Sequence, residues 1–229
     1  MNTAIIVAAG SGKRFGAKTP KQFLEINGKP LLVHTLSRFQ TCAEIDEIIL
    51  VLPPIETANF LQTIGKYGIT KLAKVIAGGA TRAESVYKGL KSVRAATAEI
   101  IAVHDGARPL VKPEEISQCV LKAKETGAAI LAALVTDTIK EVGADGAIQR
   151  TIERAALRRA LTPQCFRYEI LKRAYDVADL NEVATDESFL VERTGAKVAV
   201  VEGSADNIKI THKSDLLLAE AILKNDQTK

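Results

Sequence analysis

The feature that most constrains the fold is a regular alternation of short apolar runs with segments whose apolar residues recur every three or four positions. Runs of the first kind are typical of buried strands, and the second spacing is typical of helices that pack one face on a core. The expected strands lie at residues 4–9, 47–52, 74–77, 99–103 and 128–135, and the expected helices at residues 31–41, 54–66, 82–95 and 114–126. This alternation predicts an α/β fold in which a mostly parallel, twisted sheet carries helices on both faces.

The first expected strand runs directly into AAGSGKRFGAKTPKQF, residues 8–23, which holds three glycines, three lysines and one arginine but no acid. Ligands of parallel sheets bind at the carboxyl ends of the strands. The backbone N–H groups of such a loop can face a phosphate, and its cationic side chains can neutralise one. Those side chains are Lys13, Arg14, Lys18 and Lys21. The alternative interpretation is a solvated basic turn.

The spacing in this loop argues against three familiar motifs. Its glycines miss the dinucleotide-binding pattern by one residue, and two prolines at 53–54 stand where that fold places a ribose-binding acid, which counts against an NAD-dependent oxidoreductase. Arg14 occupies the position at which a P-loop needs Ser or Thr. Ser11 follows Ala9 by two residues where a nucleophile elbow requires glycine.

Two other expected strands also end in unusual residues. Residues 78–82, Gly-Gly-Ala-Thr-Arg, open a helix in which Ser85 lies one turn along, and this helix N-terminus favours an anion. Residues 104–109, His-Asp-Gly-Ala-Arg-Pro, place a carboxylate three residues before a guanidinium. The alternative for Asp105 is a turn-forming Asp before glycine. His104 by itself is interpreted as structural, since no Ser or Cys completes a triad with it.

Residues 136–160 depart from the alternation. Strand-like stretches flank Gly-Ala-Asp-Gly at 143–146, which resembles a hairpin tip. We interpret this segment as a dimerisation arm inserted within a single domain of residues 1–229. The alternative is an ordinary surface excursion.

Composition narrows the class of partner. The net charge of +4 comes without a dense basic block, aromatic residues make up 4% and Trp is absent, which argues against a nucleic-acid surface. Cys42, Cys119 and Cys165 are odd in number and contain no CxxC spacing, as expected of reduced cytoplasmic residues. The N-terminal apolar run stops at Gly10, and no run reaches the length of a membrane span. We therefore expect a cytoplasmic protein that binds neither nucleic acid nor membrane.

Several short motifs occur in a fixed order along nearly the whole chain. They are AAGxGxR at 8–14, PKQ at 20–22, VHDxARP at 103–109, DTIK at 137–140, LTPQ at 161–164, TD at 185–186 and DNIK at 206–209. Together they resemble the 2-C-methyl-D-erythritol 4-phosphate cytidylyltransferases of non-mevalonate isoprenoid biosynthesis. The resemblance implies a single Rossmann-like α/β domain that uses CTP and Mg²⁺ and forms a homodimer through an extended arm.

The resemblance also implies roles for individual residues. Methylerythritol phosphate would attack the α-phosphorus of CTP, and pyrophosphate would leave. Arg14 and Lys21 match residues that stabilise the transition state, whereas Lys209 and Arg154 match residues that position the sugar phosphate, Arg154 from the partner subunit. The residues that match the cytidine site are Ala8, Ala9, Gly10, Gly12, Gly79, Ala80 and Ser85. Those that match the sugar-phosphate pocket are Asp105, Arg108, Thr138, Thr162 and Thr185.

This chemistry agrees with the residues that the chain offers. Nucleotidyl transfer needs positioning and charge stabilisation, and a phosphate nucleophile with a second pKa near about 6 is already anionic, so no general base is required. Mg²⁺ is commonly held by substrate phosphates, so we expect the phosphates of CTP to bind it, with Asp105 as the one candidate ligand from the protein. The alternatives are a cytidylyltransferase for another polyol phosphate, such as ribitol 5-phosphate, and a nucleotide-binding protein without catalysis.

Overall fold

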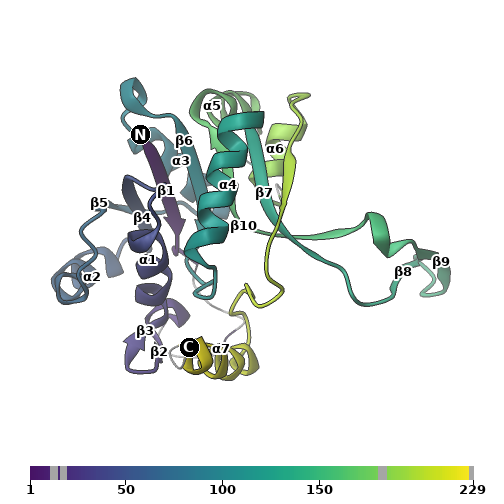
Figure 1. The fold of residues 1–229 in the computed structure, drawn as a ribbon, viewed down its shortest axis with the longest axis horizontal. Helices are drawn as coiled ribbons and strands as arrows, with labels where there is room; N and C mark the ends of the chain where they lie inside the picture. The colour runs from purple at the N-terminus through teal and green to yellow at the C-terminus, as the bar shows by residue number, and fades with distance from the viewer. Residues whose placement is uncertain (11–14, 16–19, 180–184, 227–229) are drawn as a thin grey trace.

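The computed structural model describes residues 1–10, 15, 20–179 and 185–226, and its centre is a seven-stranded sheet (Figure 1). In spatial order the strands are β11 (Ala199–Glu202), β7 (Ala128–Leu134), β10 (Arg158–Arg167), β6 (Ile100–Asp105), β1 (Asn2–Val7), β4 (Glu47–Leu52) and β5 (Leu72–Ala77). β10 runs antiparallel to both of its neighbours, and the remaining neighbouring pairs are parallel. The predicted mostly parallel sheet is therefore confirmed.

Helices cover both faces of this sheet, as the alternation predicts. One face packs against α1 (Leu31–Thr41), α2 (Glu56–Ile64) and α4 (Pro113–Thr126), and the other against α3 (Arg82–Ser92), α5 (Tyr168–Val177) and α6 (Glu187–Glu192). Successive side chains of a strand point to opposite faces. In β1, Ala4 and Ile6 accordingly join the first cluster, whereas Ile5 and Val7 join the second. The strand is buried on both faces, which explains its uninterrupted apolar sequence.

A third apolar cluster lies beyond the carboxyl end of β1. It is formed by β2 (Glu25–Ile26) and the flanking Leu24 and Leu31, by residues 107–110 after β6, and by residues 208–210 with α7 (Lys213–Asp226). The short pieces η2 (Lys21–Phe23) and β3 (Lys29–Pro30) lie on either side of β2 in the sequence. Figure 1 shows α7 below the tip of the β1 arrow. Ile26 and Ile210 are both fully or almost fully buried in this cluster. It brings residues 24–31 against residues 208–223 at the ligand-binding edge of the sheet.

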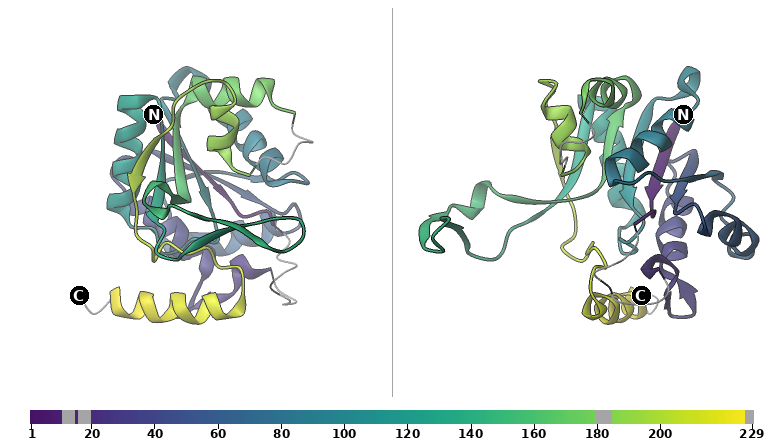
Figure 2. Two further views of the ribbon diagram at one scale, coloured as in Figure 1. Left: turned by 90° about the vertical axis from the view of Figure 1, so that its right-hand side faces the viewer. Right: turned by 180° about the vertical axis from the view of Figure 1, so that it is seen from behind.

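An extended arm leaves the sheet between β7 and β10 (Figure 2). It consists of β8 (Ile139–Val142), β9 (Ile148–Ile152) and the short helix η5 (Arg154–Ala156), and β8 pairs with β9 in antiparallel fashion. The N–H of Gly146 donates to the carbonyl of Gly143 at 3.0 Å, which confirms the predicted hairpin tip. The arm ends earlier than predicted, because residues 158–160 already pair with β7 in the central sheet.

The sequence-derived boundaries are accurate in the first half of the chain. α1 spans the predicted residues, and the five predicted strands lie within a few residues of their expected positions. β6 continues through residues 104 and 105, so that His104 and Asp105 belong to the strand itself. Four elements after residue 163, namely α5, α6, β11 and α7, were not predicted. Two short 3₁₀ helices, η3 (Gly65–Tyr67) and η4 (Ala95–Thr97), complete the described elements.

Candidate active site

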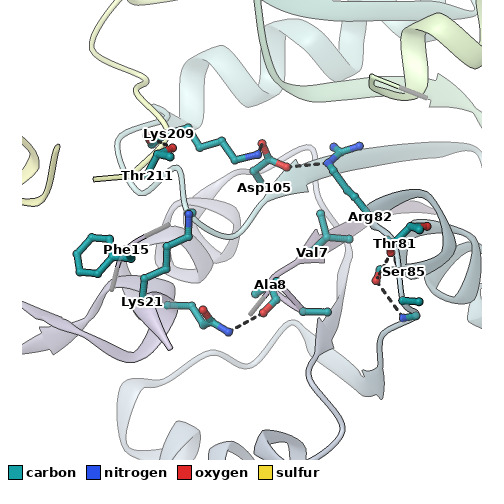
Figure 3. Close-up of a pocket in the computed structure, with 16 residues that line it drawn as sticks. Val7, Ala8, Phe15, Lys21, Thr81, Arg82, Ser85, Asp105, Lys209 and Thr211 are labelled. Carbon is teal, nitrogen blue, oxygen red and sulfur yellow. Dashed lines mark hydrogen bonds and ion pairs between the residues drawn. The ribbon is translucent and has the colours of Figure 1, made fainter. Parts of the chain in front are cut away.

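A cavity of about 480 Å³ lies at the carboxyl ends of β1 and β6, beside the N-terminus of α3 (Figure 3). Its volume falls in the range of ordinary small-molecule sites. Nine of the predicted site residues line it: Ala8, Ala9, Gly10, Lys21, Gly79, Ala80, Ser85, Asp105 and Lys209. The other lining residues are Val7, Phe15, Gln22, Thr81, Arg82, Ala107 and Thr211. The fold thus gathers residues from both ends of the chain at one site.

One wall of the cavity is main chain that follows the ends of β1 and β5. The N–H of Gly79 donates to Ser85 Oγ at 3.0 Å, and that hydroxyl donates to the Thr81 carbonyl at 2.9 Å. At Gly78 an added Cβ would lie 2.4 Å from the Cβ of Ala9, so only glycine permits this approach of the two loops. The wall is therefore a fixed backbone surface, suited to a flat or sugar-like ligand group that must come close to the main chain.

The N-terminus of α3 faces the same cavity. Thr81 is the N-cap and accepts from the N–H of Glu84 at 3.1 Å. The aligned peptide dipoles of an α-helix leave partial positive charge at this end. Together with the nearby cationic side chains, it gives the cavity a preference for anionic ligands.

Asp105 is the centre of an ion-pair network at the end of β6. Its Oδ1 lies 3.0 Å from Arg82 Nε, and its Oδ2 lies 2.8 Å from Lys209 Nζ and 3.5 Å from Arg108 Nε. Burial by itself would raise the pKa of Asp105, but the positive charges of Arg82 and Lys209 hold that pKa well below its ordinary value of 3.8. Asp105 is thus an anion whose two oxygens are both occupied by cations of the protein.

Arg82 joins this network to α6 and was not assigned a role from the sequence. Its Nη1 lies 2.7 Å from Glu187 Oε1, and the same oxygen accepts from the Tyr175 hydroxyl at 3.1 Å. Burial lowers the pKa of Arg82, but the two carboxylates outweigh it and raise the pKa above its ordinary value. The signal in the sequence was its place at the start of a helix, three residues after Gly79.

Lys21 and Lys209 reach the cavity from opposite ends of the chain. Lys21 begins η2, and its Nζ donates to the carbonyl of Ile210 at 2.6 Å. The neighbouring side chain of Gln22 is buried and donates through Nε2 to the carbonyl of Ala8 at 2.9 Å. These two bonds connect η2 to the end of β1 and to the segment that carries Lys209. Gln22 belongs to the PKQ motif but was assigned no role from the sequence, and the structure places it in the lining of the cavity.

Five further predicted residues lie outside the cavity. Arg108 and Thr162 sit behind Asp105, where Arg108 Nη1 donates to the Asn207 carbonyl at 2.7 Å and Thr162 is 4% exposed. Burial lowers the pKa of Arg108. Thr138 and Arg154 are exposed on the arm, and Thr185 is exposed next to α6. Gly12 and Arg14 lie outside the described residues.

Arg154 borders a second hollow, of about 370 Å³, at the base of the arm. Its Nη1 donates to the carbonyl of Thr136. Figures 1 and 2 show the arm projecting away from the edge of the sheet at which the cavity lies, so Arg154 does not meet Lys21 or Lys209 within one chain.

Neither a protein-only metal site nor a membrane span is found among the residues described. No group of three or more His, Cys, Asp or Glu side chains in the described ranges could hold a metal ion. None of the helices built from those residues is both long enough and apolar enough to cross a bilayer.

Comparisons with known proteins agree with this geometry. The family model for 2-C-methyl-D-erythritol 4-phosphate cytidylyltransferase matches residues 2–225. Curated relatives of that name include one from Syntrophus aciditrophicus, 45% identical over 98% of this chain and 96% of its own length. Another, from Bacillus cytotoxicus, is 46% identical over 97% of this chain and 98% of its own length.

Solved structures give the same result. The 4-diphosphocytidyl-2C-methyl-D-erythritol synthase of Anaerococcus prevotii superposes with a TM-score of 0.86 at 31% identity, over 97% of this chain and 96% of that one. The 2-C-methyl-D-erythritol 4-phosphate cytidylyltransferase of Thermus thermophilus gives a TM-score of 0.77 at 33% identity, over 98% of this chain and 100% of that one. The chain belongs to the 2-C-methyl-D-erythritol 4-phosphate cytidylyltransferase family and is a nucleotidyltransferase with a Rossmann-like fold.

Proposed function

We propose that the described cavity binds CTP and transfers its cytidylyl group to 2-C-methyl-D-erythritol 4-phosphate, releasing pyrophosphate and giving 4-diphosphocytidyl-2-C-methyl-D-erythritol for isoprenoid biosynthesis. The family membership supports the overall reaction. The observation that carries the assignment to this cavity is the convergence of Lys21 and Lys209, 188 positions apart in the chain (209 − 21), on one cavity that the N-terminus of α3 also lines. Such an array suits two anionic substrates that must approach each other.

The cytidine half of the site is proposed to be the backbone wall. Strand-end and loop main chain lies open to the cavity, and the side chains there are small, so that a base and a ribose can lie against it. The residues concerned are Ala8, Ala9, Gly10, Gly79, Ala80 and Ser85, with Gly12 assigned by resemblance from outside the described ranges. A polar group that is left unpaired against such a wall costs free energy, which is how the wall would discriminate between bases.

Lys21, with Arg14, is proposed to stabilise the charge that builds on the α-phosphate and on the departing pyrophosphate. The amine of Lys21 is held by the Ile210 carbonyl at 2.6 Å, so it is placed at the cavity before substrate arrives. Charge stabilisation by groups already in position avoids reorganisation during the reaction. The acceptor phosphate is itself the nucleophile and is anionic at neutral pH, so no side chain needs to remove a proton.

The acceptor half is proposed to lie around Asp105 and Lys209. A carboxylate can accept hydrogen bonds from the hydroxyls of a polyol, and an ammonium can pair with its phosphate. Arg108 and Thr162 would support these groups from behind. Thr138, Thr185 and Arg154 lie outside the cavity of their own chain and keep their assignment as predictions from the resemblance.

Mg²⁺ is proposed to be held mainly by the phosphates of CTP and by water. Both oxygens of Asp105 are occupied by Arg82 and Lys209, so this carboxylate would have to give up an ion pair to coordinate the metal. Mg²⁺ usually keeps several waters and is bound through substrate phosphates, which fits a cavity that supplies cations. When bound, the metal would neutralise phosphate charge as a Lewis acid.

A homodimer formed through the arm is proposed to complete the site. Arg154 stands on the arm beside a hollow lined by Leu134 and Val135, and exposed apolar side chains continue along the hairpin at Val142 and Ile148. Exposed apolar groups on a projecting hairpin suit an interface. A cytoplasmic location is likewise proposed, since the three cysteines are unpaired and buried.

The experiment is pyrophosphate release with CTP and Mg²⁺ and with either 2-C-methyl-D-erythritol 4-phosphate or ribitol 5-phosphate as acceptor. Release with the first acceptor alone is expected. Lys122→Ala serves as the matched control for Lys21→Ala, because Lys122 pairs only with Glu125 on the exposed face of α4 among the contacts described. Release with ribitol 5-phosphate alone would reassign the acceptor, and CTP binding without release from either would reject the catalytic assignment.

A further inference from the structure

His104 is buried at the end of β6 with no exposed surface, and it lies outside the cavity. Its ring packs against Phe39 with the ring centroids 4.8 Å apart. Both of its nitrogens have partners: Nδ1 lies 2.9 Å from Thr162 Oγ1, and Nε2 lies 3.1 Å from the carbonyl of Arg108. The ring therefore connects β6, β10 and the loop that follows β6.

The positions of the hydrogens on this ring follow from the partners. The Arg108 carbonyl can only accept, so Nε2 carries the proton. Burial lowers the pKa of His104 to about 3, so the ring is neutral and Nδ1 accepts from the Thr162 hydroxyl. The hydroxyl oxygen is then free to accept from the N–H of Asp105, at 3.2 Å. Each polar hydrogen in this arrangement has one acceptor, and only one tautomer satisfies all of them.

The arrangement closes into a ring of four hydrogen bonds through Asn207. The Asn207 side chain donates through Nδ2 to the Thr162 carbonyl at 2.9 Å, and the Asn207 carbonyl accepts from Arg108 Nη1 at 2.7 Å. The Arg108 carbonyl accepts from His104, and His104 accepts from Thr162. Asn207 is completely buried. The ring joins three segments distant in sequence, and Lys209 follows Asn207 by two residues.

We propose that His104 is a positioning residue for the acceptor half of the site. Through the ring with Thr162, Asn207 and Arg108 it fixes the main chain that presents Asp105 and Lys209 to the cavity. Hydrogen bonds buried in this way hold one geometry because any unpaired member would be costly. The cytidine wall, formed by the ends of β1 and β5, contributes no member of the ring. The kinetic part of this inference rests on the proposed function.

The test is His104→Phe, which keeps an aromatic ring against Phe39 and removes both hydrogen bonds. We expect the KM for 2-C-methyl-D-erythritol 4-phosphate to rise about tenfold or more, by the cost of buried groups left unpaired, and the KM for CTP to change less than about twofold. His104→Gln, whose amide can donate to the Arg108 carbonyl, should show an intermediate effect. A loss of packing alone would affect both substrates equally.

A second variant tests whether the ring acts as a unit. Asn207→Leu removes the bond to Thr162 without touching His104. If both act through the ring, the double variant should raise the acceptor KM no more than the larger single change, whereas independent effects would multiply. Multiplied effects, or a folded His104→Phe enzyme with an unchanged acceptor KM, would overturn the inference. Should His104→Phe fail to fold, the same comparison is made with His104→Gln.

Amide hydrogen exchange gives a readout that does not depend on the identity of the acceptor. In His104→Phe, exchange should increase together in the 105–110 and 204–211 segments and stay unchanged in β4 and β5. Unchanged exchange in either segment would overturn the positioning role. A wild-type protein that is inactive with methylerythritol phosphate would instead refute the proposed acceptor, and the exchange result would still decide the role of His104.

Discussion

The guanidinium of Arg82 should contribute far more to stability than a surface ion pair, and Arg82→Leu tests this. Arg82 lies 3.0 Å from Asp105 and 2.7 Å from Glu187, whose side chains are 9% and 1% exposed. Without Arg82, Asp105 keeps Lys209 at 2.8 Å. Glu187 keeps the Tyr175 hydroxyl but loses its cation. The variant therefore leaves one buried carboxylate without a compensating charge.

The magnitude follows from that burial. Removing one partner of a buried pair costs about 3–5 kcal/mol, whereas an exposed pair contributes about 0–1 kcal/mol. Because the Arg82 side chain is 29% exposed, we take the lower end, about 3 kcal/mol. For a chain of this size that corresponds to a fall in Tm of roughly 6–12 °C. Lys122→Leu, which breaks an exposed pair with Glu125, is the matched control and should cost less than about 1 kcal/mol.

The assay is urea unfolding followed by circular dichroism at a fixed protein concentration, at pH 7 and pH 5. Folding lowers the pKa of Asp105, so the stability from this group is present above its unfolded value of 3.8 and is lost only as the pH falls below it. Between pH 5 and pH 7 the contribution of Asp105 to stability is therefore constant. Adding Glu187→Gln should recover most of the deficit of Arg82→Leu, because it removes the charge of the carboxylate that has lost its cation.

A deficit below about 1 kcal/mol would refute this reasoning, because Arg82 would then behave as a surface charge. So would a double variant as unstable as Arg82→Leu alone, since the orphaned carboxylate would not be the cause.

Three further predictions concern the reaction. Lys21→Ala should lower kcat about 10²–10³-fold, by analogy with oxyanion-hole donors. A fall of less than about tenfold in steady-state pyrophosphate release would show that Lys21 does not stabilise the transition state. Gly78→Ala should raise the KM for CTP at least about tenfold, because the added Cβ would lie 2.4 Å from the Cβ of Ala9. Gly65→Ala is the control, since a Cβ at Gly65 would meet no atom within 4 Å, and equal CTP affinity in the two variants would contradict the close-packed wall. Mixing inactive Lys21→Ala and Arg154→Ala chains should restore activity if Arg154 acts on the partner's site, and mixed dimers that stay inactive after verified subunit exchange would count against that.

The sequence predicts those parts of the site whose signal is local. The first strand ends in glycines and cations, which led to Lys21, and the strand at 99–103 ends in His-Asp-Gly-Ala-Arg-Pro, which led to Asp105, before their neighbours in space were known. Helix α1 has the predicted bounds because its apolar spacing and a preceding proline are contained in one short segment. The same reasoning places the hairpin tip at residues 143–146. In each case, contacts within a few residues of one another determine the conformation.

Arg82 and β10 show what such reasoning misses. Glu187, which pairs with Arg82, lies 105 residues away, and the place of Arg82 after the glycines at 78–79 does not predict that pairing. β10 contains a proline and two leading arginines, yet it occupies an interior position between β6 and β7. The position of β10 depends on the chain coming back from the arm to the central sheet. Strand pairings of this kind are set by the topology and not by a local sequence pattern, so the predicted arm extends to residue 160 although β10 begins at Arg158.

The buried carboxylate of Asp105 is an unexpected choice in a site for anions, and the network explains it. In the described ion-pair network together with Lys21, the charges sum to +2, from Lys21, Arg82, Arg108 and Lys209 against Asp105 and Glu187 (4 − 2). The side chain of a free lysine loses up to about 2 kcal/mol of rotamer entropy when it is fixed. The ion pair at 2.8 Å meets that cost during folding, so that the ammonium of Lys209 is already in place when the acceptor binds. Asp105 thus lowers the positive potential of the site but fixes the position of the Lys209 ammonium. A fixed cation favours the reaction more than extra positive charge does, because the reaction depends on the relative placement of two phosphates.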